Sequence, residues 1–371
     1  MYDILFIAPA NSIHAHRWIE NFSENKFKWI SFQDANTVYS NLNDQQKKNC
    51  EDIIISKFLK KPVIPIFLCI YYVIKLKPKV IHVHSVYKYA FYSLLIFFFH
   101  KKIILTIWGS DFLNNRKNFF KKIFFKFIFS KSKYITTDGL HIKNKVEKVS
   151  KFSSSKIEII NFGLDKFYTN TDIDKKFVDK NILKLCNTSK KIIFSSRGYD
   201  IHYGYLDIIE SAHEINEAGL LDFIVILCGS GGNEEYKNII DYKIKRYNLM
   251  NKVHCLQNLG KYDLKYLLSN SYVYISSSRT DAGISASICE SMSQNIPVIA
   301  EDNSDNCQWV INGLNGFTYD LNKRFHLTKK ILQIKDLDMQ KLKEFNEKKL
   351  YNENNIINEM GKMKKLIDSI K

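Results

Sequence analysis

The sequence predicts an α/β protein built from two parallel-sheet domains. Short apolar runs with the composition of strands alternate with helix-like segments along the chain, which is the pattern of a parallel α/β sheet. At 371 residues the chain is also long for one hydrophobic core. A polar stretch at residues 168–180 interrupts the alternation, and the pattern starts again after it, so we place a linker there.

The first half opens with a strand, M-Y-D-I-L-F-I-A-P, which lacks the basic segment and cleavage site of a signal peptide. The predicted strands of this half are residues 3–8, 29–32, 80–84, 103–108, 134–137 and 157–161. The predicted helices are residues 15–22, 63–74, 89–99, 119–129 and 140–149.

The second half repeats the alternation. Its predicted strands are residues 191–196, 223–228, 253–256, 272–277 and 297–300, with helices between them. The tail from Asn322 is rich in Lys, Glu and Asn and is predicted to be helical. Apolar residues make up 45% of the chain, so it can bury a sizeable core, and this excludes a disordered protein.

Basic residues outnumber acidic ones by 55 to 38, which gives a formal net charge of +17. This excess indicates an anionic partner, whether nucleic acid, anionic lipid or an anionic substrate. The basic residues are concentrated at residues 114–133, where seven cations and six Phe occur without an acidic residue.

Three interpretations of this segment stay open. We favour a helix from Arg116 to Lys133 that lies in a membrane interface, with Phe side chains among acyl chains and lysines at anionic headgroups. A core helix with a basic outer face would have the same composition. Basic and aromatic residues can also bind single-stranded nucleic acid, but no nucleic-acid module accompanies them, so we expect no such partner.

Two further apolar zones, residues 63–74 and 91–99, favour attachment to a membrane surface. Each is shorter than the roughly 18–20 residues that span a bilayer, so we predict no transmembrane helix. The seven cysteines are odd in number and lack C-x-x-C or Cys/His metal spacing, which is typical of reduced thiols in a cytosolic protein. We therefore expect a cytoplasmic protein, peripheral on the inner face of the cytoplasmic membrane.

The stretch from Asp281 to Gly316 carries the main candidate site. Ser285 and Ser287 fall in the first turn of a predicted helix, where unpaired backbone N–H groups and the helix dipole favour an anion. Glu290 lies three residues beyond Ser287, and a carboxylate there can accept hydrogen bonds from a ribose diol. For Glu290 alone, the alternative is a solvated residue on an amphipathic helix.

Two other positions in the second half point to a phosphate. Arg197 ends the first strand, and ligands bind at the carboxyl ends of parallel strands. A guanidinium there can clamp a diphosphate through two parallel hydrogen bonds, although a surface salt bridge is the alternative. Gly229 begins a G-S-G-G turn after another strand, where backbone can approach a ligand, but a plain strand-to-helix turn would look the same.

The first half offers weaker candidates. His14 and Arg17 fall on one helical face after the first strand, near where an acceptor or a pyrophosphate would lie; a surface role is the alternative for the histidine. Trp108 and Asp111 follow another strand, and Asp111 could instead cap the next helix. The I-H-V-H pattern at residues 81–84 puts two histidines on one face of a strand, without an acidic residue at metal-binding spacing.

These motifs resemble the donor-site region of sugar-nucleotide glycosyltransferases of the GT-B fold, family 4. One branch of that family reads roughly D-G-x-x-x-S-L-L-E-A-M-x-x-G-x-P-I-V, then a loop ending in E-W, then N-G. The matching residues here are Asp281, Ser287, Glu290, Ser291, Met292, Pro297, Val298, Gln308, Trp309, Asn315 and Gly316. Ala282 departs from the first Glu of the E-x7-E found in many members, and Gln308 replaces the usual Glu before the Trp.

The strand-end arginine adds to the resemblance. In the family, an Arg followed by a Lys holds the diphosphate, whereas this chain is similar to a branch with R-x-x-x-x-x-Y, in which Tyr203 takes the Tyr place and the Lys is absent. Many relatives have a His in the loop after this strand, and that His touches the transferred sugar. Here Trp108 stands near that place, as in a branch of the family with W-G-S-D.

The resemblance implies two Rossmann-like domains that face each other across a cleft. An acceptor-side domain would cover residues 1–170 and a crossing helix at about 350–371, and a donor domain would cover residues 171–349. The implied activity is that of a retaining hexosyltransferase, which moves a sugar from a nucleotide diphosphate sugar, expected to be a UDP-sugar, to a lipid-linked or surface-polysaccharide acceptor. Polysaccharide, capsule or lipopolysaccharide assembly is the implied setting.

The resemblance also implies residue roles. The donor-binding set is Arg197, Tyr203, Gly229, Ser285, Ser287 and Glu290. The candidate catalytic residues are Asp281, Glu290 and Asp111, and the acceptor-side residues are His14, Arg17 and Trp108. No D-x-D motif lies at a strand end, so we predict that neither metal nor cofactor is needed. Two alternatives are an inactive subunit of this fold that binds nucleotide sugar or a partner enzyme, and a sugar-nucleotide epimerase.

Overall fold

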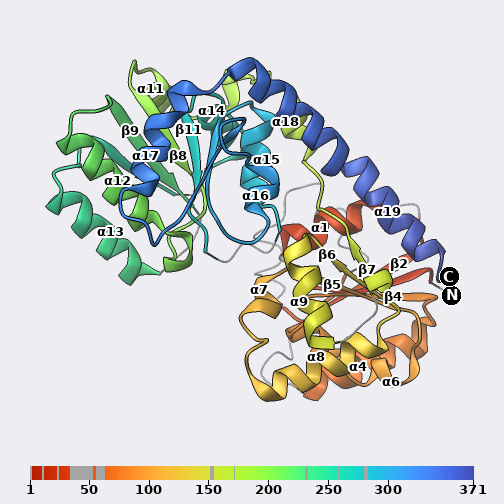
Figure 1. The fold of residues 1–371 in the computed structure, drawn as a ribbon. Helices are drawn as coiled ribbons and strands as arrows, with labels where there is room; N and C mark the ends of the chain where they lie inside the picture. The colour runs from red at the N-terminus through yellow and green to blue at the C-terminus, as the bar shows by residue number, and fades with distance from the viewer. Residues whose placement is uncertain are drawn as a thin grey trace. The chain divides into compact units, whose positions relative to one another are not determined.

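The computed structural model divides the chain into two compact units (Figure 1). It describes residues 2–10, 12–22, 25–33, 53–55, 63–150, 154–170, 172–229, 233–257, 259–279 and 283–371. The N-terminal unit consists of Met1–Gly163 together with Ile356–Lys371, and the C-terminal unit is Leu164–Asn355. The sequence placed these bounds near residues 170 and 350.

The N-terminal unit is organised around a seven-stranded parallel sheet with the order β3-β2-β1-β4-β5-β6-β7. The strands are β1 (Ile4–Ile7), β2 (Phe27–Ser31), β3 (Ile53–Ile55), β4 (Val80–His84), β5 (Ile103–Ile107), β6 (Tyr134–Thr137) and β7 (Ile157–Ile159). The sequence predicted all of these except the three-residue β3. The central strands β1, β4 and β5 are buried along their whole length, as expected for a parallel sheet covered on both faces.

Helices cover both faces of this sheet. They are α1 (Ile13–Ile19), α4 (Val63–Leu76), α5 (Lys88–Tyr92), α6 (Ile96–Phe99), α7 (Ser110–Leu113), α8 (Phe119–Lys131), α9 (Leu140–Ser150) and α19 (Ile356–Asp368). Figure 1 shows α4, α6 and α8 on one side of the sheet and α1 with α19 on the other. The helix predicted at residues 89–99 is two helices, α5 and α6. Where α5 ends, the buried Ser93 hydroxyl donates to the Tyr89 carbonyl at 2.9 Å, a side-chain bond of the kind that bends helices.

The last helix is anchored to the N-terminal sheet by a buried carboxylate. Glu359 has no exposed surface, and its Oε2 accepts the backbone N–H of Asn161 at 2.8 Å, just beyond β7. Met360 and Met363 of the same helix pack in a core that includes Trp18 of α1. The C-terminal residues therefore complete the N-terminal unit.

The C-terminal unit contains a six-stranded parallel sheet with the order β10-β9-β8-β11-β12-β13. The strands are β8 (Lys191–Ser195), β9 (Phe223–Cys228), β10 (Val253–Leu256), β11 (Val273–Ser276), β12 (Val298–Glu301) and β13 (Gly316–Tyr319). The chain runs outward from β8 to β10 and then returns to the other side of β8 as β11. Ligands of open parallel sheets bind at such a reversal, beyond the carboxyl ends of the strands.

Two helical layers enclose this second sheet. The helices are α10 (Lys166–Thr169), α11 (Lys180–Cys186), α12 (Tyr205–Glu217), α13 (Glu234–Arg246), α14 (Lys261–Ser269), α15 (Ala286–Ser293), α16 (Asn306–Trp309), α17 (His326–Gln333) and α18 (Met339–Glu353). One core joins α12, α13 and α17 to the sheet, and the other joins α11, α14 and α15.

The predicted linker at residues 168–180 is packed against this unit. Lys265 of α14 is only 2% exposed, and its ammonium donates to the carbonyls of Phe167 at 3.0 Å and Asp172 at 3.1 Å. Tyr168 is buried in the core on the same side. Residues 168–180 are therefore packed against the C-terminal unit despite their polar composition.

Gly316 at the start of β13 gives a stability prediction. A Cβ atom there would lie 1.8 Å from the Val298 carbonyl oxygen of the neighbouring β12, so Gly316→Ala must push the paired strands apart. We expect a loss of about 3 kcal/mol in unfolding free energy, measured by urea denaturation. Gly361→Ala is the matched control, because a Cβ on this helical residue meets no atom within 4 Å, and it should be neutral or slightly stabilising. Equal stabilities of the two variants would contradict the steric argument.

Candidate functional site

The candidate site of the C-terminal unit forms where the strand order reverses, beyond the carboxyl ends of β8 and β11. Arg197 follows β8, and the loop after β11 leads to the N-terminus of α15. One Arg197 amino group (Nη1) donates to the Ser287 hydroxyl at 3.3 Å, and the guanidinium carbon lies 5.1 Å from the centre of the Tyr203 ring. The structure thus brings together three of the residues that the sequence assigned to donor binding.

Tyr205 fixes the turn that presents Arg197. Its buried hydroxyl accepts the backbone N–H groups of Arg197 at 2.8 Å and Gly198 at 2.9 Å, and donates to the Cys228 carbonyl at 2.5 Å. Burial raises the pKa of Tyr205 well above its usual value, so the hydroxyl stays protonated. Sequence reasoning selected Tyr203 and missed Tyr205, although both tyrosines follow Arg197 within eight residues.

Gly229 is needed because two loops meet there. A Cβ atom on Gly229 would lie 2.2 Å from the Cα of Gly198, which itself has a φ of +113°. The loops that follow β8 and β9 can therefore approach this closely only with glycine at both positions. Residues 230–232 of the predicted glycine turn lie outside the described residues.

The helix α15 places a positive dipole end next to Arg197. Ser285 is its N-cap, with an extended backbone and a hydroxyl that accepts the Ile288 N–H at 3.3 Å. The same hydroxyl lies 3.2 Å from the Ser287 hydroxyl, which Arg197 contacts. A guanidinium, two hydroxyls and a helix N-terminus converge here, and this combination favours an anion.

Glu290 lies one turn further along α15 and is only 8% exposed. The alternative of a solvated glutamate is therefore wrong. Neighbouring α15 residues Ile288 and Met292 are fully buried in the core, which holds the helix in place. A carboxylate held this way is suited to accepting hydrogen bonds from vicinal hydroxyls.

The rest of the predicted donor motif is described only in part. Asp281 and Ala282 lie outside the described residues. Asn315 is fully buried and links three backbone or side-chain groups: its amide donates to the Trp309 carbonyl and to Asn346, and its oxygen accepts the Ile311 N–H. The N-G pair of the motif therefore shapes the turn before β13.

Arg279 is a further cation at this edge that sequence reasoning did not select. It follows β11, and its guanidinium pairs with both carboxylate oxygens of Asp207 at 3.0 and 3.3 Å. Burial raises the pKa of Asp207, and the Arg279 charge opposes that shift. The preceding strand offered the same strand-end signal that identified Arg197.

The predicted acceptor-side residues belong to the N-terminal unit. His14 and Arg17 lie in α1, but their side chains are outside what the structure describes. Trp108 follows β5, and its ring centre lies 5.9 Å from that of His84 at the end of β4. Asp111 lies inside α7, which begins at Ser110, so it does not precede that helix as a cap.

Asp111 holds two loops through its carboxylate. One oxygen accepts the Val86 N–H at 2.7 Å and the other accepts the Phe112 N–H at 3.0 Å. Burial raises its pKa to about 6, although these backbone hydrogen bonds favour the charged form. The residue thus connects the segments that follow β4 and β5.

The raised pKa of Asp111 predicts a pH-dependent stability. The folded state binds this proton more tightly than the unfolded state, so the contribution is complete below about pH 4 and is lost as the pH rises through about 6. Asp111→Asn cannot titrate, so wild type should lose roughly 2 kcal/mol relative to this variant between pH 4 and pH 8. Urea unfolding at both pH values measures the difference, and a constant difference would contradict the assignment.

His82 and His84 form a buried neutral pair on β4. Their ring centres are 4.1 Å apart, and His82 Nε2 lies 2.7 Å from the Thr106 hydroxyl. Burial lowers the pKa of His82 to about 3 and that of His84 well below its usual value. Among the described residues no group of histidine, cysteine and acidic side chains could hold a metal ion.

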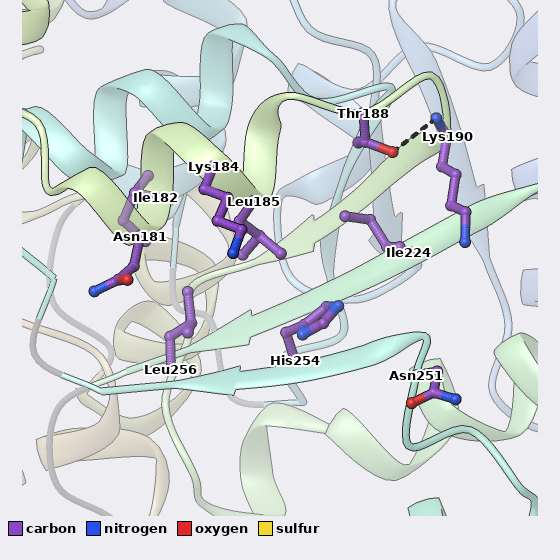
Figure 2. Close-up of a pocket in the computed structure, with 10 residues that line it drawn as sticks. All are labelled: Asn181, Ile182, Lys184, Leu185, Thr188, Lys190, Ile224, Asn251, His254 and Leu256. Carbon is purple, nitrogen blue, oxygen red and sulfur yellow. Dashed lines mark hydrogen bonds between the residues drawn. The ribbon is translucent and has the colours of Figure 1, made fainter.

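A separate pocket of about 480 Å³ lies on one flank of the C-terminal unit (Figure 2). Figure 2 shows His254 of β10 below Lys184 and Leu185 of α11, and the hydrogen bond from the Lys190 N–H to the Thr188 hydroxyl measures 3.2 Å. Lys190 precedes β8, whereas Arg197 follows it. The pocket shares no lining residue with the Arg197 site.

Two family models match the chain. Glycosyl transferases group 1 matches residues 178–350, and Glycosyl transferase 4-like matches residues 3–139. The two matches together span most of both units. No curated protein matches the chain significantly.

Solved structures share the fold over the whole chain. A glycosyltransferase from Rickettsia africae ESF-5 has a TM-score of 0.77 at 19% identity, with 100% of this chain and 98% of that chain covered. HepE from Anabaena in complex with UDP has a TM-score of 0.78 at 12% identity, covering 99% and 100%, and it was also solved with UDP-glucose. Sucrose-phosphate synthase from Thermosynechococcus elongatus has a TM-score of 0.75 at 13% identity, covering 100% and 99%.

Proposed function

Since the chain belongs to the group 1 glycosyltransferases of the GT-B fold and is a hexosyltransferase, we propose that it transfers a sugar from a UDP-sugar to a lipid-linked acceptor. The observation that carries the donor assignment is the contact of Arg197 with Ser287 at the N-terminus of α15. UDP and UDP-glucose bind to a protein of the same fold. The lipid-linked acceptor is favoured by the cation- and Phe-rich segment from Arg116 to Lys133.

In this proposal, Arg197 and the N-terminus of α15 hold the diphosphate. The guanidinium supplies a fixed positive charge, and the helix dipole adds to it without reorganisation during the reaction. The contact with Tyr203 and the Ser287 hydroxyl restricts the guanidinium to one direction. Both groups stabilise the negative charge that develops on the leaving diphosphate.

Glu290 accepts hydrogen bonds from the ribose, and Asp281 orients the sugar. The anomeric carbon gains oxocarbenium character as its bond to the diphosphate oxygen breaks, and the acceptor hydroxyl attacks from the same face, which retains the configuration. The leaving oxygen takes the acceptor's proton, so the chemistry needs no separate paired acid and base. We assign Asp111 to holding the loops after β4 and β5, because both of its oxygens accept backbone N–H groups.

Transfer to lipid is tested with UDP-sugars that carry a radiolabel. The protein would be incubated with each labelled donor and with a bacterial lipid extract, and the label would then be partitioned between water and butanol. The proposal predicts label in the organic phase, dependent on both extract and protein, and undiminished by EDTA. Label that passes solely to water-soluble sugars would contradict the lipid acceptor, and loss of activity in EDTA would contradict metal independence.

A further inference from the structure

One helix of the N-terminal unit presents an apolar face to solvent. In α4, Val63, Phe67, Tyr71 and Ile74 are 52–63% exposed, and their spacing of four, four and three residues places them on one side of the helix. Pro65, Cys69 and Val73 are buried on the other side. The helix carries no charged residue before Lys75, so its outer face lacks the polar side chains of an ordinary surface helix.

The neighbouring helices extend this apolar surface. Exposed apolar side chains in the α5–α6 segment are Tyr87, Phe91, Leu95, Phe98 and Phe99, and those on α8 are Phe119, Phe120 and Ile123. Together with the α4 residues these make twelve of the 24 exposed large hydrophobic side chains in the described part of the chain, within residues 63–123. Such a concentration on a folded protein marks an interaction surface.

Ring contacts join the α5–α6 segment to α8, and α4 packs against α5. The rings of Phe98 and Phe127 are 4.7 Å apart, which connects α6 to α8, and those of Phe91 and Phe124 are 6.2 Å apart. The ammonium of Lys121 lies 4.3 Å from the centre of the Tyr87 ring. Figure 1 shows α4, α6 and α8 along the same side of the sheet.

The structure also corrects the expectation for α8 alone. Phe125 and Phe129 have no exposed surface and pack in the core with Phe112, so the six Phe of this segment do not form one outer face. Phe119 and Phe120, at the start of the helix, are 69% and 78% exposed. The apolar contribution of α8 is therefore its N-terminal end, and most of the apolar surface lies on α4 to α6.

The charge of this region identifies the partner. Between residues 63 and 133 there are thirteen Lys and Arg and a single acidic residue, Asp111, whose carboxylate is occupied by backbone N–H groups. Lys88, Lys117, Lys122 and Lys126 are exposed beside the apolar side chains. Apolar anchors surrounded by cations suit the headgroup region of an anionic bilayer, where lysine ammonium groups reach lipid phosphates.

We propose that α4, α5, α6 and the start of α8 form a single docking surface for an anionic lipid bilayer. This inference rests on the proposed lipid-linked acceptor, and it names the partner that would bring the enzyme to it. No helix in the described residues combines the length and the apolar composition that spanning a bilayer requires. In this proposal the exposed apolar side chains of α4, α5, α6 and α8 insert at the level of the headgroups.

Vesicle flotation of the full chain tests the surface. Wild type should float with vesicles that contain phosphatidylglycerol, bind phosphatidylcholine vesicles much more weakly, and be released by high salt. Phe67→Ser with Ile74→Ser on α4, and separately Phe119→Ser with Phe120→Ser on α8, should each lower the partition coefficient by about tenfold or more. The matched control is Ile239→Ser with Tyr242→Ser on α13, which are also exposed and should leave flotation unchanged.

The outcomes separate this inference from the proposed function. Flotation that is absent, or that ignores lipid charge and the α4 and α8 changes, would overturn the surface. A change in sedimentation mass of the α4 or α8 variants would show that the face instead binds a second copy. Release of UDP from a UDP-sugar by a protein that does not float would leave the transferase intact and remove only the docking surface. Flotation without turnover would support the docking surface and contradict the proposed transferase.

Discussion

Arg197→Ala is expected to lower kcat/KM for the UDP-sugar by about 10²- to 10³-fold. The guanidinium contacts Ser287 at the N-terminus of α15, and the family's neighbouring Lys is absent, so no second side chain of that motif replaces its charge. Arg197→Lys should recover little, because an ammonium cannot form two parallel hydrogen bonds to phosphate oxygens or stack on Tyr203 in the same way.

The measurement is steady-state UDP release, with thermal unfolding to verify the fold of each variant. Arg246→Ala provides a matched control, since this arginine lies exposed at the end of α13. Unchanged kinetics in Arg197→Ala would place the diphosphate elsewhere. A loss of thermal stability comparable to that of a core substitution would mean that Arg197 acts through the fold.

Glu290→Gln is expected to lower kcat/KM by about 10-fold to 100-fold, because hydrogen bonds to a charged group contribute about 1.5–3 kcal/mol. The Glu290 side chain is only 8% exposed on α15. Because Gln has nearly the same shape as Glu, the substitution removes the charge and leaves the packing of this buried side chain unchanged. If the carboxylate binds the ribose, wild type should discriminate strongly against a UDP-sugar that lacks the ribose hydroxyls, and the variant should discriminate little.

This comparison forms a double-mutant cycle between enzyme and substrate. Free-energy coupling between loss of the carboxylate and loss of the ribose hydroxyls would support direct contact. Purely additive losses in kcat/KM would contradict it. Glu217→Gln on α12 serves as the control, since its side chain is 67% exposed.

Much of the fold follows from alternating sequence patterns. Strands of five or six residues with continuous apolar character, such as β5 and β9, were predicted because parallel strands are buried on both faces. The strands β3 and β13 were missed. β3 has only three residues, and β13 begins at Gly316, whose place in the sheet depends on the close approach of β12.

Tertiary packing decided the features that local pattern could not. The Phe-rich α8 places Phe125 and Phe129 inside and Phe119 and Phe120 outside, and composition alone does not separate these pairs. Lysine side chains are usually exposed. Lys265 is buried because its ammonium donates hydrogen bonds to two backbone carbonyls of a segment far away in the sequence.

The candidate donor site was predictable where chemistry and spacing agreed. Arg197 at a strand end and Ser285 to Glu290 on a short helix are adjacent in space because β8 and β11 are neighbouring strands. Tyr205 was not predictable, since its role depends on two backbone N–H groups and a carbonyl that meet only in the folded unit. Asp281 stays a prediction.

The central claim, donor cleavage at the Arg197–α15 site, is tested most directly by UDP, GDP and ADP release from a panel of their sugars. Inverted membrane vesicles would supply the acceptor, assays would be run with and without EDTA, and Glu290→Ala would be assayed alongside wild type. We predict UDP release from one class of UDP-sugar, unaffected by EDTA and lowered by about 100-fold or more in Glu290→Ala, which removes all of the ribose hydrogen bonds to this side chain. Turnover that Glu290→Ala leaves at the wild-type rate, or nucleotide binding without any turnover, would contradict the account.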